Sequence, residues 1–246
     1  MPPASRVSRL DLSAFPDVWR VEDLARGKAT VSSGAPALDA QLPGGGWPTG
    51  VMVEVLQRSP GRHVWQLLLP ALATTLQEQD GPIVLVGAPW RPFGPSLTAQ
   101  GVRPERLLCI QADQRAARLW AAGQALRCAQ VAAVLAWLPQ ASNQDLRRLH
   151  LAAQQHEHLL FVFRNAGHRH EASPAALRLL VEGIDQLEVR IIKRKGPPLL
   201  QPLQLPATSR RMAALLQARR GLRTLSREPV PAPERSHGLD RTAAIP

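Results

Sequence analysis

Apolar positions along this chain follow two alternating patterns from about residue 30 onward. Short, nearly continuous apolar runs predict buried strands at residues 51–56, 83–87, 107–111, 131–138 and 159–163, with an alternating sixth at residues 187–193. Apolar residues at helical spacing predict helices between them, at residues 63–79, 113–129 and 143–156. Continuously apolar strands separated by helices are typical of a parallel sheet with helices on both faces. The pattern therefore predicts an α/β fold.

The character of the chain changes on either side of this alternating region. Residues 1–29 are expected to form a loose arm with a short helical element at residues 17–26. Residues 30–205 are the predicted core domain. Residues 206–246 are expected to hold a helix with six arginines and no acid at residues 209–227, and then a disordered, proline-rich tail.

The composition of the chain indicates which kinds of partner it binds and in which cellular compartment it is expected. The net charge of +11 points towards polyanions or acidic protein surfaces, although a generally basic, solvated surface would give the same charge. The N-terminus has no apolar signal segment and no stretch of 18 apolar residues occurs, so we expect a cytoplasmic protein without membrane contact. Cys109 and Cys128 fall in a predicted strand and on a predicted helix face, which favours two buried thiols.

The most informative motif is a glycine-rich stretch that leads into a loop after the first predicted strand. A phosphate-binding loop reads Gly-x-x-x-x-Gly-Lys-Ser/Thr, because backbone N–H groups, a lysine and a metal-binding hydroxyl converge on phosphate. In this chain the loop retains Gly61, but Arg62 replaces the lysine and His63 replaces the hydroxyl. The loop is therefore interpreted as a degenerate nucleotide site, with ATP as a doubtful ligand through Arg62.

Three ordered segments resemble RecA-type recombinases. They are the lead from Ser33-Gly34 through Gly44-Gly45-Gly46 to Glu54, the approach and strand at residues 101–113, and the basic strand end at residues 187–198. Within that superfamily, Val18-Trp19-Arg20, Leu42-Pro-Gly-Gly-Gly-Trp-Pro48, Val134-Leu-Ala-Trp-Leu-Pro139 and Lys193-Arg-Lys-Gly-Pro-Pro198 resemble the ImuA family, which is related to the cell division inhibitor SulA. The resemblance covers roughly residues 30–205 and implies a RecA-like, mostly parallel sheet.

The resemblance also implies a function. ImuA-type proteins belong to the damage-inducible machinery of translesion DNA synthesis, so the implied partners are ImuB, a Y-family polymerase homologue, and an error-prone polymerase reached through ImuB. DNA and a second copy of the chain are further candidates. Two alternatives stay open: an ATP-binding recombinase paralogue acting on single-stranded DNA, and a SulA-like inhibitor that binds the division protein FtsZ.

The positions that carry catalysis in ATP-hydrolysing relatives hold no carboxylate. The strand expected to end in a metal-binding aspartate ends Ala136-Trp137-Leu138, and the expected catalytic glutamate is replaced by Ala88-Pro89-Trp90. We therefore predict no enzymatic activity and no cofactor. Trp47 and Trp90 are hypothesised to fill the space that a nucleotide would occupy, whereas Trp65, Trp120 and Trp137 are expected in the core.

Basic residues supply the candidate binding sites for nucleic acid or a protein partner. One group lies at the end of the last predicted strand and the other in the predicted arginine-rich helix: Arg190, Lys193, Arg194 and Lys195, and Arg210, Arg211, Arg219, Arg220 and Arg223. Two His-x-His pairs, at His156 and His158 and at His168 and His170, lack the cysteine or carboxylate partners of metal sites. We therefore expect surface histidines and no metal.

Overall fold

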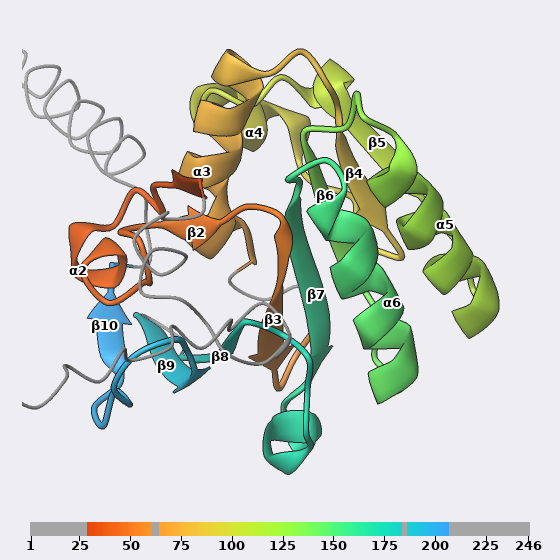
Figure 1. The fold of residues 1–246 in the computed structure, drawn as a ribbon. Helices are drawn as coiled ribbons and strands as arrows, with labels where there is room; N and C mark the ends of the chain where they lie inside the picture. The colour runs from red at the N-terminus through yellow and green to blue at the C-terminus, as the bar shows by residue number, and fades with distance from the viewer. Residues whose placement is uncertain (1–28, 61–63, 184–185, 207–246) are drawn as a thin grey trace, which may run out of the picture. The chain divides into compact units, whose positions relative to one another are not determined.

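An eight-stranded mixed sheet forms the centre of the protein (Figure 1). The computed structural model describes residues 29–60, 64–183 and 186–206. The strand order is β10-β9-β8-β3-β7-β6-β4-β5, in which β3 to β8 run parallel and β9 and β10 join antiparallel at one edge. The strands are β3 (Val51–Gln57), β4 (Ile83–Val86), β5 (Leu107–Ile110), β6 (Ala133–Trp137), β7 (Leu159–Asn165), β8 (Leu177–Glu182), β9 (Leu187–Lys193) and β10 (Leu203–Leu205). The predicted α/β fold with a mostly parallel sheet is confirmed.

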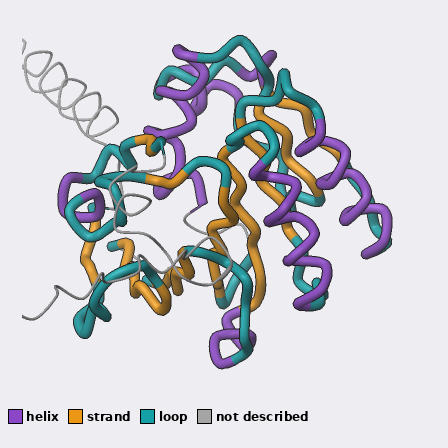
Figure 2. Tube along the Cα trace, viewed as in Figure 1, coloured by secondary structure: helices purple, strands orange, loops and turns teal. Residues whose placement is uncertain are grey.

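Helices cover both faces of this sheet (Figure 2). One face packs against α2 (Pro36–Asp39), α3 (Val64–Glu78) and α4 (Gly94–Ala99) through a cluster centred on Leu68, Leu72 and Phe161. The opposite face packs against α5 (Arg115–Arg127) and α6 (Asn143–Gln154) through Leu126, Leu146 and Val162. Because β3, β4 and β6 are buried on both faces, their sequences are continuously apolar rather than alternating.

The glycine-rich lead has a structural role in this fold. It carries the short strands β1 (Thr30–Val31) and β2 (Trp47–Pro48), which pair with each other. Asp39 accepts hydrogen bonds from the Ser32 hydroxyl (2.6 Å) and the Ser33 backbone N–H (2.8 Å) and so closes the turn before α2. Gly34 has φ of +77°, and a Cβ there would lie 2.4 Å from Pro70 Cβ of α3. Only glycine fits this approach without a shift of the helix.

Several short elements of the described residues were not predicted from the sequence. The strands among them are β1, β2, β8 and β10; the helical turns are α2, α4, η2 (Pro104–Arg106) and η3 (Ala166–His170). The predicted inward face of residues 113–129 is also wrong at Trp120, which is 67% exposed, because the contact is made by smaller side chains, Ala121, Ala122, Ala125 and Leu126.

The prediction of two buried thiols is wrong, since Cys109 and Cys128 are both exposed. Cys109 lies on β5, the last strand of the sheet, and Cys128 lies one residue beyond the end of α5. Within the described residues, no helix is long and apolar enough to cross a membrane. The predicted helices at residues 17–26 and 209–227 lie outside the described residues.

Candidate functional site

A pocket of about 360 Å³ opens at the carboxyl ends of the parallel strands. In parallel α/β sheets this edge is where ligands bind, because the connecting loops diverge there. The pocket lies beyond β3, β4, β5, β6 and β7, and its lining includes Gln57, Gly87, Ala88, Gln111, Trp137, Phe163, Arg164 and Asn165. The pocket therefore lies beside the loop that the sequence predicted to be a degenerate nucleotide site.

Two stacked aromatic rings form one wall of this pocket. Trp137 at the end of β6 and Phe163 on β7 have ring centroids 4.5 Å apart and planes inclined by 19°. Both side chains are buried, and among the described residues the Trp137 Nε1–H has no hydrogen-bond partner. The wall is thus apolar with one unmatched donor, whereas a magnesium–nucleotide site needs oxygen ligands.

Among the residues that the structure describes, no acidic residue lines the pocket. Ala88 and Pro89 line it after β4, and Trp137 lines it at the end of β6, at the two positions where relatives with ATPase activity would carry carboxylates. The nearest cationic group on its α5 side is Arg118, whose Nε donates to the Ala112 carbonyl (2.5 Å). The described lining therefore offers no carboxylate that could bind a metal ion or act as a general base.

The hypothesis that Trp47 and Trp90 fill this pocket is not supported, since neither lines it. Trp47 is fully buried on another part of the sheet, edge-on to Phe161 with ring centroids 5.3 Å apart. Trp90 is 74% exposed. Trp137 is buried as predicted, and Trp65 packs partly buried against the core.

A buried ion network lies on the α5–α6 side of the sheet, next to the pocket. Glu54 of β3 is fully buried and accepts hydrogen bonds from Arg164 of β7 (2.9 Å) and Arg178 of β8 (2.6 Å). The three residues lie on adjacent strands, with Glu54 directly opposite Arg178 in the register. Their charges are paired and hydrogen-bonded, which is the condition for burying them at tolerable cost.

The two arginines also fasten the loops at this edge of the sheet. Arg178 donates to the carbonyls of His168 and Glu171 (2.9 Å each), and Arg164 donates to the Ala141 carbonyl (3.0 Å). Glu171 pairs with His168 (2.8 Å) and Arg164 (3.2 Å), and these two partners hold the pKa of Glu171 below its ordinary value. The network therefore fixes η3 and the loop after β6 to the strands that line the pocket.

The basic residues at the end of β9 have individual neighbours rather than one shared site. Arg190 is exposed and lies 3.5 Å from Glu188, and Lys193 Nζ donates to the Ser173 carbonyl (3.0 Å). Arg194 is half-buried and donates to the carbonyl and side-chain oxygens of Gln41, at 2.5 and 3.1 Å. Arg194 thus links the end of β9 to the turn after α2. Lys195 is exposed.

The other predicted site residues cannot be placed with these. Gly61, Arg62 and His63, and the arginines at 210, 211, 219, 220 and 223, lie outside the described residues. Their assignment stays a prediction from the sequence.

The histidine pairs do not gather into a metal site. The described residues contain no group of three or more His, Cys, Asp or Glu side chains able to hold a metal ion. His158 is buried, contrary to the surface position expected, and its ring lies 5.5 Å from that of His156. Burial, together with His156, lowers the pKa of His158, although backbone hydrogen bonds with Cys128 and Val131 oppose this.

The sequence reasoning missed the functions of Arg164 and Arg178. Each is a single arginine within an apolar run, Phe161-Val-Phe-Arg164 and Leu177-Arg-Leu-Leu-Val181. A lone charge in a buried strand signals an ion partner on a neighbouring strand. The matching signal was Glu54, the single acid in the run of residues 51–56.

Comparison with known proteins gives one partial match. A scan against models of known protein families finds none that matches the chain. The chain is 32% identical over 132 residues to the cell division inhibitor SulA of Pseudomonas aeruginosa, and this alignment covers 50% of the chain and 80% of that protein.

Proposed function

This chain belongs to the family of the cell division inhibitor SulA, and on that premise we propose that it is a non-catalytic, RecA-like accessory protein of the response to DNA damage. Its role in this proposal is to hold ImuB and an error-prone polymerase together during translesion synthesis. The family relationship supports a function linked to DNA damage or cell division. The ImuA-like motifs favour translesion synthesis within that range.

One observation carries the non-catalytic part of the proposal. The pocket at the carboxyl edge of the sheet is lined by the Trp137–Phe163 stack, and its described residues include no carboxylate. Phosphoryl transfer depends on a metal ion and on preorganised charge at the transferred group, and removal of those groups together removes most of the rate enhancement. A fold without them retains its surfaces and loops, which are what an accessory protein uses.

Titration with magnesium–ATP tests this part. We expect no saturable heat in calorimetry up to about millimolar nucleotide, which marks the weak end of ligand affinities. We also expect phosphate release at the rate of a protein-free blank. The matched variants are Arg62→Ala in the degenerate loop and Arg58→Ala, whose side chain instead pairs with Glu182. ATP hydrolysis that Arg62→Ala abolishes and Arg58→Ala retains would overturn the proposal and favour the recombinase paralogue.

A second candidate function is inhibition of cell division through FtsZ. The match to SulA is the observation that favours it. Its test is overproduction in cells without DNA damage, where filamentation together with direct binding of purified FtsZ would support inhibition. Normal division at the same protein level would leave the accessory function as the better account.

DNA contact is a further part of the proposal and rests on the basic residues. If Arg190, Lys193 and the C-terminal arginines contact phosphates, affinity for single-stranded DNA should fall steeply with salt and show little dependence on sequence. Binding that is insensitive to salt would remove DNA from the list of partners. We place the accessory function in the cytoplasm, where the damaged chromosome lies.

A further inference from the structure

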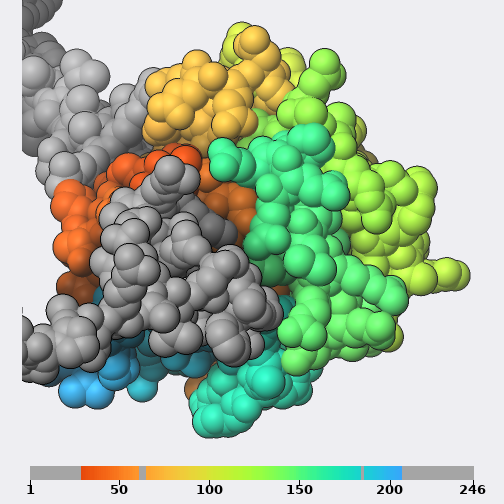
Figure 3. Space-filling model, viewed as in Figure 1, coloured from red at the N-terminus to blue at the C-terminus, as the bar shows by residue number. Residues whose placement is uncertain are grey.

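A groove of about 650 Å³ runs between α5 and α6 on the outer surface of the protein. The two helices lie side by side at the surface, α5 in yellow-green and α6 in green (Figure 3). The α5 wall extends from Arg115 to Arg127, so the groove is roughly 18 Å long at 1.5 Å per residue. That length matches about three turns of a helix.

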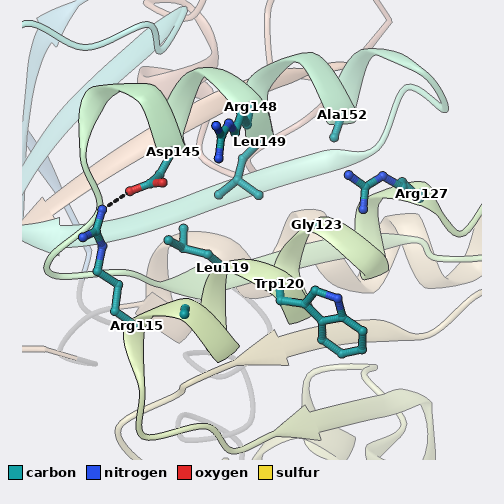
Figure 4. A pocket seen from close by; sticks show the side chains of 10 residues that line it. Arg115, Leu119, Trp120, Gly123, Arg127, Asp145, Arg148, Leu149 and Ala152 are labelled. Carbon is teal, nitrogen blue, oxygen red and sulfur yellow. Dashed lines mark hydrogen bonds and ion pairs between the residues drawn. The ribbon is translucent and has the colours of Figure 1, made fainter.

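The floor and walls of the groove are apolar and partly small. Leu119 of α5 points towards Leu149 of α6, and Ala152 lines the α6 side of the groove (Figure 4). Trp120 is 67% exposed on the outer wall, turned away from α6. Gly123 lies mid-groove, and a Cβ there would find only the end of the Arg127 side chain, at 3.8 Å. Small residues between two helices allow a third helix to approach closely.

Positive charges outnumber negative ones around these apolar residues, since the described lining holds Arg115, Arg127 and Arg148 but one aspartate. That aspartate, Asp145, pairs with Arg115 at one end of the groove. Partial burial opposes ionisation of Asp145, but hydrogen bonds from Ser142 and the pairing with Arg115 outweigh it and lower its pKa. Its negative charge is therefore balanced. Arg127 and Arg148 are exposed and make no ion pair within the described residues.

We propose that this groove binds an acidic amphipathic helix of a partner protein. The partner's apolar stripe packs against Leu119, Leu149 and Ala152, and its carboxylates pair with Arg127 and Arg148. Helix-in-groove recognition uses apolar anchors at this spacing, with flanking charges that set orientation. A nucleic acid fits less well, because the two free arginines are separated by an apolar floor rather than joined in a continuous basic track.

This inference deepens the proposed accessory function and rests on it, since it names the chemistry of a partner. The two fail separately. The accessory function fails if the unsubstituted protein does not bind ImuB, whereas the groove assignment fails in the peptide experiment below whether or not ImuB binds.

The probe is a synthetic peptide of about 16 residues, constrained as a helix, with leucines at positions i, i+4 and i+7 and glutamates flanking them. A peptide with lysine at each glutamate is the first comparison, and a thymidine oligonucleotide is the second. Binding to the full chain is followed by fluorescence anisotropy. The variant is Arg127→Glu with Arg148→Glu, and the charge-matched control is Arg103→Glu with Arg147→Glu, two exposed arginines outside the groove.

We expect saturable binding of the acidic peptide, and at least about tenfold weaker binding to the groove variant, because reversing both charges places glutamates against the glutamates of the peptide. The control variant should bind like the unsubstituted protein, and Trp120→Ala should weaken binding where Leu151→Ala, outside the groove, does not. No saturable binding, or equal loss in the groove and control variants, would overturn the proposal. Tighter binding of the oligonucleotide that is lost in the groove variant would also overturn it and identify a phosphate-binding surface.

Discussion

Replacing Glu54 by glutamine should destabilise the protein severely, although the two side chains have nearly the same shape. The side chain of Glu54 is 0% accessible to solvent, and the side chains of its partners Arg164 and Arg178 are 3% and 6% accessible. The substitution removes one negative charge and leaves two guanidinium groups buried without it. The remaining partners are backbone carbonyls and the partly exposed Glu171.

The expected cost follows from this geometry. Breaking a buried pair by removing one partner costs about 3–5 kcal/mol, because the uncompensated charge stays in the interior. With a urea dependence of about 2 kcal/mol per M, the unfolding midpoint should fall by roughly 1.5–2.5 M. No cavity forms, so the loss reports the charge and not packing.

Urea unfolding followed by tryptophan fluorescence is the assay. The matched control is Glu188→Gln, which removes a partly exposed carboxylate 3.5 Å from the exposed Arg190. Exposed pairs contribute about 1 kcal/mol or less, so the control should stay within about 0.5 M of the unsubstituted protein. If Glu54→Gln and Glu188→Gln shift the midpoint equally, the reasoning about the buried network is wrong.

Two further substitutions test other parts of the fold. Burial and His156 lower the pKa of His158, so as the pH falls the unfolded chain binds a proton at this histidine before the folded protein does. Stability should therefore be lost as the pH falls through and below about 6.5. His158→Asn should reduce that loss in unfolding measurements between acid and neutral pH, and an unchanged pH profile would contradict the assignment. Gly34→Ala places a Cβ 2.4 Å from Pro70 Cβ at positive φ, and should cost about 1–3 kcal/mol in the same urea assay; Gly196→Ala, also at positive φ but with open space around it, should cost less.

The sequence predicted β3, β4, β6 and β7, which are buried on both faces, and also the less buried strands β5 and β9. In β3, β4 and β6 the apolar residues are consecutive and the runs are short, and these two features together identify them as buried strands. β8 escaped because Arg178 interrupts its apolar run, and only the pairing with Glu54 of another strand explains a buried arginine there. The bounding residues, Pro174 and Gly183, were available as signals.

The edge position of a strand and the inward face of a helix were harder to predict than the strands themselves. Cys109 was predicted in the core because its strand is apolar, but β5 lies at the edge of the sheet, and strand order is set by long-range pairing. The prediction placed Trp120 on the face of the helix that packs against the sheet. Alanines make most of that contact instead, since close packing of α5 favours small side chains. The carboxyl-edge pocket was predictable in position, because ligands bind at this edge of a parallel sheet. Its Trp137–Phe163 wall was not, because the stack joins two strands that are distant in sequence.

Co-purification with ImuB tests the central claim most directly. Purified chain and purified ImuB, mixed without nucleotide and separated by size-exclusion chromatography, should elute as one complex, and added magnesium–ATP should leave that complex unchanged. The same experiment with a chain ending at Leu205 assigns the contribution of the C-terminal arginines. Separate elution of the full chain and ImuB, with FtsZ retained in place of ImuB, would contradict the account and make division inhibition the function.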